Sequence, residues 1–241
     1  MTTFVLVPGM WLGAWAWHDV TARLRSAGHD VHPLTLTGLA DRAHTGGPHT
    51  DLDTHATDVV ALIETEELSD VVLVGHSHGG SVVALAADRI PDRLRRVVYV
   101  EGGPLPNGTR QLDTLDAQSQ DRIREQVGDG WLVPPREWDA DQDPVLLRGL
   151  DAPTLAMLAR RCTGHPFGSV SQPLKVSGAA AAVPRTLVAC TFTADQVREM
   201  IAQGHPFFGG VAGADILGLP TGHWPMFSEP DRLADLLAEI D

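Results

Sequence analysis

Residues 71–80 read VVLVGHSHGG, which places Ser77 between glycines in a G-x-S-x-G pattern. An apolar run, 71–74, precedes the pattern, and a stretch of small and apolar residues, 79–89, follows it. This context predicts a sharp turn from a buried strand into a helix, because the flanking glycines leave room for the bend. The serine hydroxyl would then project near a helix N-terminus, where negative charge is favoured. The alternative is a glycine-rich turn with an incidental serine.

Short apolar runs alternate with helical stretches on both sides of this turn. Continuous apolar strands separated by helices indicate an α/β fold, with a mostly parallel sheet of about six strands covered on both faces. Strands are predicted at 4–7, 31–34, 71–74, 97–100, 185–190 and 215–219, and helices at 16–27, 51–68, 79–89, 195–203 and 229–240.

The alternation stops between residues 104 and 183. This stretch is rich in proline, has no strand pattern, and contains helical patches near 113–127, 143–149 and 153–162. An insertion of this kind between two strands of one sheet is typical of a helical cap. We therefore predict a cap at 104–183 on a core formed by 1–103 and 184–241.

Composition narrows the class of protein. The chain has 241 residues, with 18 Lys and Arg against 31 Asp and Glu, for a formal net charge of −13. This acidic balance argues against a nucleic-acid partner and against an anionic membrane surface. No apolar run reaches the ~18 residues that a membrane span needs, and the N-terminus lacks the basic region of a signal peptide. We expect a cytoplasmic protein; the oligomeric state is left open.

A serine needs a base to take its proton, so a histidine must come from elsewhere in the chain. In a Ser…acid…His order this histidine follows the last strand. His223 does so, just before the terminal helix, whereas the rival His205 follows a helix. We predict that His223 is the base.

Two carboxylates compete to be the acid that orients this histidine. Asp195 lies after the strand 185–190, where it also suits the first turn of a helix capped by Thr193 and Gln196. Glu101 stands at the end of the strand 97–100, and open sheets place ligands at the carboxyl ends of their strands. We prefer Glu101 and keep Asp195 as the alternative.

Two backbone N–H groups are expected to stabilise an oxyanion, each contributing about 3 kcal/mol. One belongs to His78, the residue after the serine, and the other to the loop after the first strand. In that loop Gly9 lets the chain pass close to the substrate, and Met10 carries the expected donor.

Histidines elsewhere do not form a recognisable metal site. His44, His49 and His55 lie near several aspartates, but their spacing matches no ligand set. The pair His76 and His78 could open an H-x-H-x-D-H pattern, but the required Asp and third His are absent. We predict no metal and no cofactor.

Five stretches carry a family pattern: LVPG at 6–9, GAWAW at 13–17, AGH at 27–29, VLVGHSHGG at 72–80 and GHWPMFSEP at 222–230. Together they give a resemblance to the small α/β-hydrolases that include plant methylesterases, hydroxynitrile lyases and their bacterial relatives. It implies an α/β-hydrolase fold with a serine nucleophile, and it is weak over the cap.

Departures from the family pattern refine what the resemblance implies. The plant esterases carry their acid after a later strand, at the position that reads Thr193 here, whereas many bacterial relatives have an acidic residue where Glu101 stands. Pro8 replaces the usual histidine of the oxyanion loop. The hydroxynitrile lyases have a threonine near Gly9 and a lysine in the place of Trp224, so cyanohydrin cleavage is disfavoured.

These observations predict a serine hydrolase that cleaves a carboxylic ester or lactone of a small apolar substrate through an acyl-enzyme. Its pocket is expected to be lined by Trp11, Trp131, Trp138 and Trp224, although core packing is as good an account of each ring. One alternative is a lyase or cyclase acting on a natural product, whose signature would be a polar cap residue such as His165 aimed at the serine. The other is a non-catalytic ligand-binding protein with the same fold.

Overall fold

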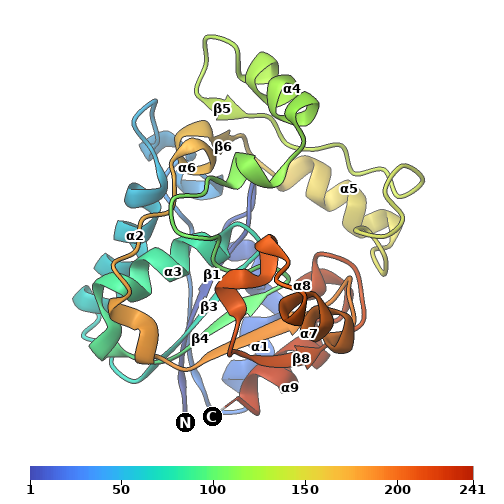
Figure 1. Cartoon of the computed structure of the whole chain (residues 1–241). Coiled ribbons are helices and arrows are strands. Elements are labelled where there is room, and N and C mark those ends of the chain that lie inside the picture. The colour runs from blue at the N-terminus through green and yellow to red at the C-terminus, as the bar shows by residue number, and fades with distance from the viewer. Residues whose placement is uncertain (241) are drawn as a thin grey trace.

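A computed structural model describes residues 1–240, apart from the side chains of residues 206 and 207. Its centre is a six-stranded sheet in the order β2-β1-β3-β4-β7-β8, in which every neighbouring pair is parallel (Figure 1). The strands are β1 (Thr3–Val7), β2 (Asp30–Pro33), β3 (Val71–His76), β4 (Leu94–Val100), β7 (Arg185–Ala189) and β8 (Asp215–Gly218). The α/β fold class predicted from the apolar runs is confirmed.

Alternate side chains of the strands pack in two separate hydrophobic cores, one on each face of the sheet, because successive residues of a strand point to opposite faces. Val71 and Leu73 pack on one face with residues of α2 (Leu52–Thr65) and α3 (Gly79–Arg89). Val72 and Val74 pack on the other face with residues of α1 (His18–Ser26) and α9 (Pro230–Ala238). All six residues of β3 are buried, which explains its unbroken apolar run before Gly75.

The remaining elements of the core depart from the predicted ranges at their ends. The predicted helix 16–27 begins as a 3-10 helix and continues as α1. The predicted helix 229–240 corresponds to α9, and the short α8 (Pro225–Ser228) precedes it. α7 (Ala194–Ala202) lies between β7 and β8. Short 3-10 helices occupy Ala14–Trp17, Ala40–Thr45, Pro91–Arg93, Gln111–Thr114, Ala179–Ala182 and Pro206–Val211.

Residues 104–183, called the inserted segment below, add no strand to the main sheet. They contain α4 (Ala117–Val127), α5 (Ala152–Arg161) and α6 (Phe167–Ser171), and most of them lie beyond the carboxyl ends of the strands (Figure 1). The expectation of no strands here is wrong, since β5 (Leu132–Val133) and β6 (His165–Pro166) form a small antiparallel pair. The division into a core and a cap stays a prediction.

The helical patch expected at 143–149 is also wrong. These residues form turns, because the carbonyl oxygens of Leu146 and Arg148 accept hydrogen bonds from His223 and Gly222 in a distant loop. No helix within residues 1–240 has both the length and the apolar character that crossing a membrane requires.

Candidate active site

Ser77 occupies the bend between β3 and α3. Its φ of +52° lies in the left-handed region, where a residue other than glycine is strained. A Cβ on Gly79 would stand 2.7 Å from the carbonyl oxygen of Pro8, and one on Gly75 would stand 2.6 Å from that of Gly79. Both glycines are therefore needed for the close packing of this turn, as the motif predicts. The Ser77 N–H donates to Val100 at 3.0 Å, which ties the bend to β4.

His223 reaches Ser77 from the loop after β8. Its Nε2 lies 2.9 Å from the Ser77 Oγ, a hydrogen-bond distance. The backbone of His223 is held on both sides: its N–H donates to Leu146 at 2.7 Å, and its carbonyl accepts from His76 Nε2 at 2.8 Å. Burial lowers the pKa of His76 to about 3, so this ring is a neutral donor at neutral pH. The structure thus brings together the serine and the histidine predicted from the sequence.

Glu101 stands behind His223 with φ at +46°. Its Oε1 lies 3.8 Å from His223 Nδ1, which is an ion-pair separation rather than a hydrogen bond. Its Oε2 accepts N–H groups from Cys190 at 2.7 Å and Thr191 at 3.2 Å, and the Thr191 hydroxyl donates to Oε1. Burial acts to raise the pKa of Glu101, but His223 and these donors outweigh it and hold the pKa below its ordinary value. The side chain is a buried carboxylate at neutral pH.

The rival residues lie elsewhere. Asp195 is in the first turn of α7 with 94% of its side chain exposed, and it pairs with Arg198 at 2.6 Å. Thr193 and Gln196 form the capping box expected beside it. His205 is exposed after α7, with its ring 5.6 Å from that of Phe208. Neither Asp195 nor His205 is brought to Ser77.

The two amides expected to bind an oxyanion lie on turns next to Ser77. A Cβ on Gly9 would stand 3.1 Å from the Ser77 Cβ, so the loop that carries Met10 passes directly over the serine. His78 is the N-cap residue of α3. Within residues 1–240, neither the Met10 N–H nor the His78 N–H has a hydrogen-bond acceptor. Neither donor is therefore used in holding the described fold together.

The four tryptophans are distributed between packing and the surroundings of His223. Trp224 is buried, with its ring 4.8 Å from those of both His223 and Trp138. Trp11 is half-buried and packs in a small cluster of the inserted segment, and Trp131 packs over Gly46. None of these rings lines the cavity beside the acid and the base.

That cavity has a volume of about 190 Å³ and adjoins Glu101 and His223. Its apolar lining includes Leu146, Phe192 and Phe208, which were not predicted from the sequence. Phe192 offered a weak signal, as an aromatic residue just after β7, but Leu146 and Phe208 reach the site through long-range folding alone.

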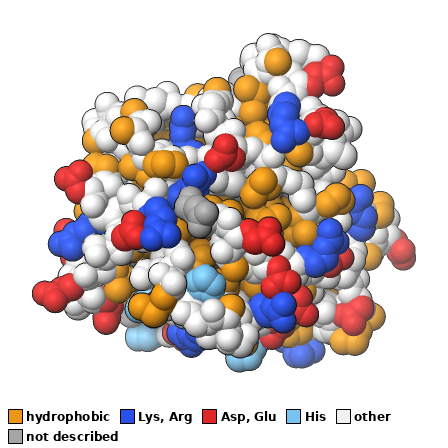
Figure 2. Space-filling model, turned by 90° about the horizontal axis from the view of Figure 1, so that it is seen from below, with side chains coloured by type: hydrophobic (Ala, Val, Ile, Leu, Met, Phe, Trp, Pro, Cys, Tyr) orange, Lys and Arg blue, Asp and Glu red, His pale blue; other side chains and the backbone are white. Residues whose placement is uncertain are grey.

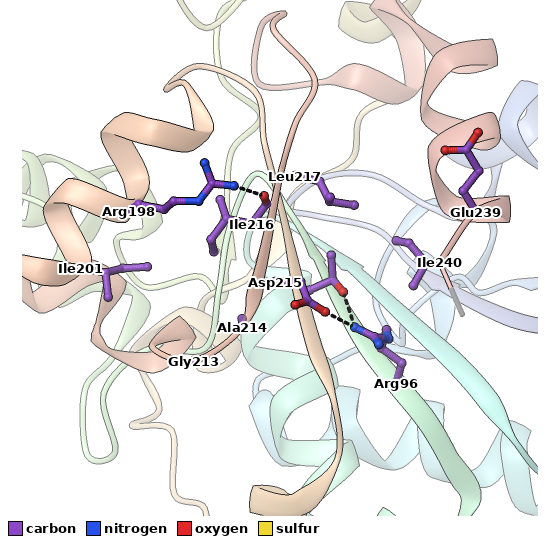
Figure 3. A pocket seen from close by; sticks show the side chains of 11 residues that line it. Arg96, Arg198, Ile201, Gly213, Ala214, Asp215, Ile216, Leu217, Glu239 and Ile240 are labelled. Atoms are coloured by element: carbon purple, nitrogen blue, oxygen red, sulfur yellow. Dashed lines mark hydrogen bonds and ion pairs between the residues drawn. The ribbon is translucent and has the colours of Figure 1, made fainter.

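Larger cavities lie away from this chemistry. One of about 660 Å³ lies at the β8 edge and includes Arg96, Asp215 and Arg198 (Figure 3). Arg96 pairs with Asp215 at 2.6 Å, and Arg198 donates to the Ile216 carbonyl, so these polar groups already have partners within the protein. Asp215 begins β8, and ligands of open α/β sheets bind at the opposite, carboxyl ends of strands. The face near both chain termini mixes acidic and basic side chains, without a broad basic surface (Figure 2).

One group of residues near Ser77 has the composition of a metal site. His55, His78 and His165 are buried, and one ring nitrogen from each lies within 4.8 Å of the others. Sequence spacing did not reveal this cluster, because its members come from α2, the turn after β3, and β6. His44 and His49, which were considered with His55, are exposed.

Comparisons with known proteins agree with this architecture. A family model described as the alpha/beta hydrolase family matches residues 4–236. A carbendazim hydrolyzing esterase of Nocardioides sp. (strain SG-4G) is 32% identical over 256 residues, covering 100% of both chains. Putative methylesterase 14, chloroplastic, of Arabidopsis thaliana is 25% identical, covering 98% of this chain and 71% of that protein.

Solved structures show the same fold. An extracellular α/β-hydrolase from a Paenibacillus species, described as sharing structural and functional homology with tobacco salicylic acid binding protein 2, superposes with a TM-score of 0.83 at 19% identity. The match covers 99% of this chain and 98% of that one. A pyrethroid hydrolase superposes with a TM-score of 0.78 at 20% identity, covering 99% and 96%.

Proposed function

The chain belongs to the alpha/beta hydrolase family, and on that premise we propose that it is a serine hydrolase cleaving a carboxylic ester or lactone of a small apolar substrate. The observation that carries this proposal is the 2.9 Å contact between His223 Nε2 and Ser77 Oγ, with the Glu101 carboxylate behind the ring. Named relatives support an α/β-hydrolase-type enzyme that acts on esters.

Each residue has a role that its position allows. Ser77 Oγ attacks the carbonyl carbon as His223 Nε2 takes its proton, and the charged imidazole is stabilised by Glu101. The N–H groups of Met10 and His78 bind the oxyanion. His223 then returns the proton to the leaving alcohol, which leaves an acyl group on Ser77. A water molecule, deprotonated by His223, releases the acid and restores the serine.

The cavity beside His223 and Glu101 supports a small apolar substrate by its size and lining, although Ser77 itself does not line it. About 190 Å³ beside His223 suits a compact group, and Leu146, Phe192 and Phe208 offer it apolar contacts. Trp224 packs against the His223 ring and so helps to hold the base in place. No step of this reaction uses a cofactor. The cytoplasmic location expected from the sequence stays a prediction.

The proposal is tested by labelling and turnover together. We expect a fluorophosphonate probe to label Ser77 and a short aryl ester to be hydrolysed, with both signals lost in Ser77→Ala. Ser81→Ala is the matched control, because Ser81 is a buried serine one turn into α3. A wild-type protein that neither reacts with the probe nor cleaves esters would overturn the proposal and favour a ligand-binding protein.

Hydrolysis is separated from lyase or cyclase chemistry by the fate of solvent oxygen. Reaction in ¹⁸O-labelled water is expected to give an acid that contains the label, since water releases the acyl group. A product without the label would exclude hydrolysis. The polar residue considered as a lyase signature, His165, directs its nitrogens to Trp11 and Ser169 rather than to Ser77.

A further inference from the structure

A chain of buried hydrogen bonds connects the two turns that carry the predicted oxyanion donors. The Trp11 N–H donates to His165 Nδ1 at 3.3 Å, and His165 Nε2 lies 2.7 Å from the Ser169 Oγ. The same Oγ lies 3.3 Å from His78 Nε2. The chain thus begins next to Met10 and ends on His78, after crossing the inserted segment.

The direction of these hydrogen bonds follows from the chemistry of their ends. A backbone N–H only donates, so His165 Nδ1 is the acceptor and the ring proton is on Nε2, which donates to Ser169. At the other end, Gln111 Oε1 accepts from His78 Nδ1 at 3.4 Å, which leaves His78 Nε2 as an acceptor. Ser169 can therefore donate to His78 Nε2, in competition with the Pro166 carbonyl at 3.0 Å.

Burial makes each link costly to lose. His165, Ser169 and His78 are 0%, 1% and 2% exposed, so water cannot replace a missing partner. Burial also lowers the pKa of His78 to about 4 and places that of His165 well below its ordinary value. The rings are neutral at neutral pH, as the hydrogen-bond directions require.

The Trp11 backbone adopts a conformation that needs such support. Its φ of +65° is unfavourable for a residue with a side chain. Both polar groups of its backbone are held from the inserted segment: the N–H by His165, and the carbonyl by the Thr163 N–H at 3.1 Å. Because Met10 immediately precedes Trp11, this clamp holds the peptide plane next to the one that carries the Met10 N–H.

We propose that His165 and Ser169 are positioning residues: through the inserted segment, they hold the predicted oxyanion donors of Met10 and His78 in a fixed position relative to each other. This inference rests on the proposed hydrolase function.

A metal ion held by His55, His78 and His165 would need a lone pair from each ring. The Trp11 amide already uses that of His165 Nδ1, and His165 Nε2 carries the proton.

Substitution at residue 165 separates positioning from packing. His165→Leu removes the acceptor for the Trp11 N–H, whereas the amide oxygen of His165→Asn restores an acceptor near the position of Nδ1. Removing one oxyanion donor costs about 100-fold to 1000-fold in kcat, and displacing one costs less. We expect kcat on an aryl ester to fall about 10-fold to 100-fold in His165→Leu with little change in KM, and to recover largely in His165→Asn.

Ser169→Ala tests the second link, and Ser171→Ala provides the matched control on the same short helix, since the Ser171 hydroxyl contacts only the Gly168 carbonyl. We expect a lower kcat in Ser169→Ala alone. An alkyl boronic acid forms a tetrahedral adduct on Ser77, so its affinity should fall in the same variants, and to a similar extent, as kcat. If the variants merely lost packing, boronic acid affinity and kcat would not fall together.

The outcomes distinguish this inference from the function on which it rests. If wild type turns over and Ser77 is labelled, but folded His165→Leu keeps its kcat, the positioning role is overturned and the hydrolase function stands. If wild type shows neither turnover nor labelling, both fall. If a chelator lowers the kcat of the wild-type protein as His165→Leu does, and Zn²⁺ restores it, the three histidines form a metal site and the positioning role is overturned.

Discussion

At the scale of single residues, the Glu101 side chain is 11% exposed and yet stays a charged carboxylate at neutral pH. Three hydrogen bonds from Cys190 and Thr191 hold the carboxylate, and its Oε1 faces His223 Nδ1 at 3.8 Å. Asp195, by contrast, is exposed and pairs with Arg198 rather than with His223. A charge that stabilises an imidazolium must lie close to the ring and away from bulk water, where screening is weak.

Neutralising the two carboxylates in turn tests this assignment. We expect Glu101→Gln to lower kcat on an aryl ester by about 100-fold or more, because the imidazolium loses its counter-charge. We expect Asp195→Asn to remain within about two-fold of wild type, because an exposed ion pair contributes little. If Asp195→Asn alone abolishes turnover, Glu101 is not the acid.

At the scale of elements, the turn at residues 143–149 holds the loops that carry the base and the acid. Leu146 accepts the His223 N–H, and the Arg148 guanidinium donates to the carbonyls of Thr221 and Cys190. Cys190 in turn donates its N–H to Glu101. The inserted segment is thus linked to the backbone on both sides of the His223 and Glu101 pair.

Removing the Arg148 guanidinium is expected to disturb this alignment. Arg148→Met should lower kcat about 10-fold, since small displacements of a catalytic group are costly, while fluorophosphonate labelling of Ser77 slows in proportion. Arg160→Met, which removes an exposed arginine from α5, provides the control and should match wild type. Equal kcat values for the two variants would show that the Arg148 clamp has no part in alignment.

At the scale of the whole molecule, buried neutral histidines couple stability to pH. Burial lowers the pKa of His76 to about 3 and that of His78 to about 4, and it also lowers those of His55 and His165. The unfolded chain takes up protons at the ordinary pKa of about 6.5, so it binds more protons than the folded chain below that pH. The free energy of unfolding must therefore fall as the pH drops from 6.5 towards 4.

Urea unfolding at pH 7.5 and pH 5 measures this effect. We expect His76 and His78 to account for a loss of about 2 kcal/mol each between the two pH values, since a difference of one pKa unit corresponds to about 1.4 kcal/mol. His44→Gln removes an exposed histidine and should leave the difference unchanged, whereas His78→Leu should reduce it. A protein equally stable at both pH values would contradict the buried, neutral state of these rings.

Local sequence rules established the strands, the serine turn and the membership of the family. Apolar runs such as 71–74 predicted the strands within a few residues, because a strand buried on both faces must be apolar throughout. The glycines around Ser77 predicted the bend, because no larger residue fits there. The predicted fold and the family resemblance are both confirmed, and Ser77, Glu101 and His223 meet because the chain order of such sheets places them at one edge.

Long-range contacts account for what local patterns could not predict. The sequence at 143–149 favours a helix, but the carbonyls of this turn accept hydrogen bonds from the His223 loop instead of from a following helical turn. The members of the histidine cluster come from α2, the turn after β3, and β6. The tryptophans divide between packing and the neighbourhood of the base according to which segments fold over them. A residue's nearest neighbours in sequence fix its backbone preference. Its hydrogen-bond partners and burial depend on distant segments, as for Trp11 and His165, which are 154 positions apart.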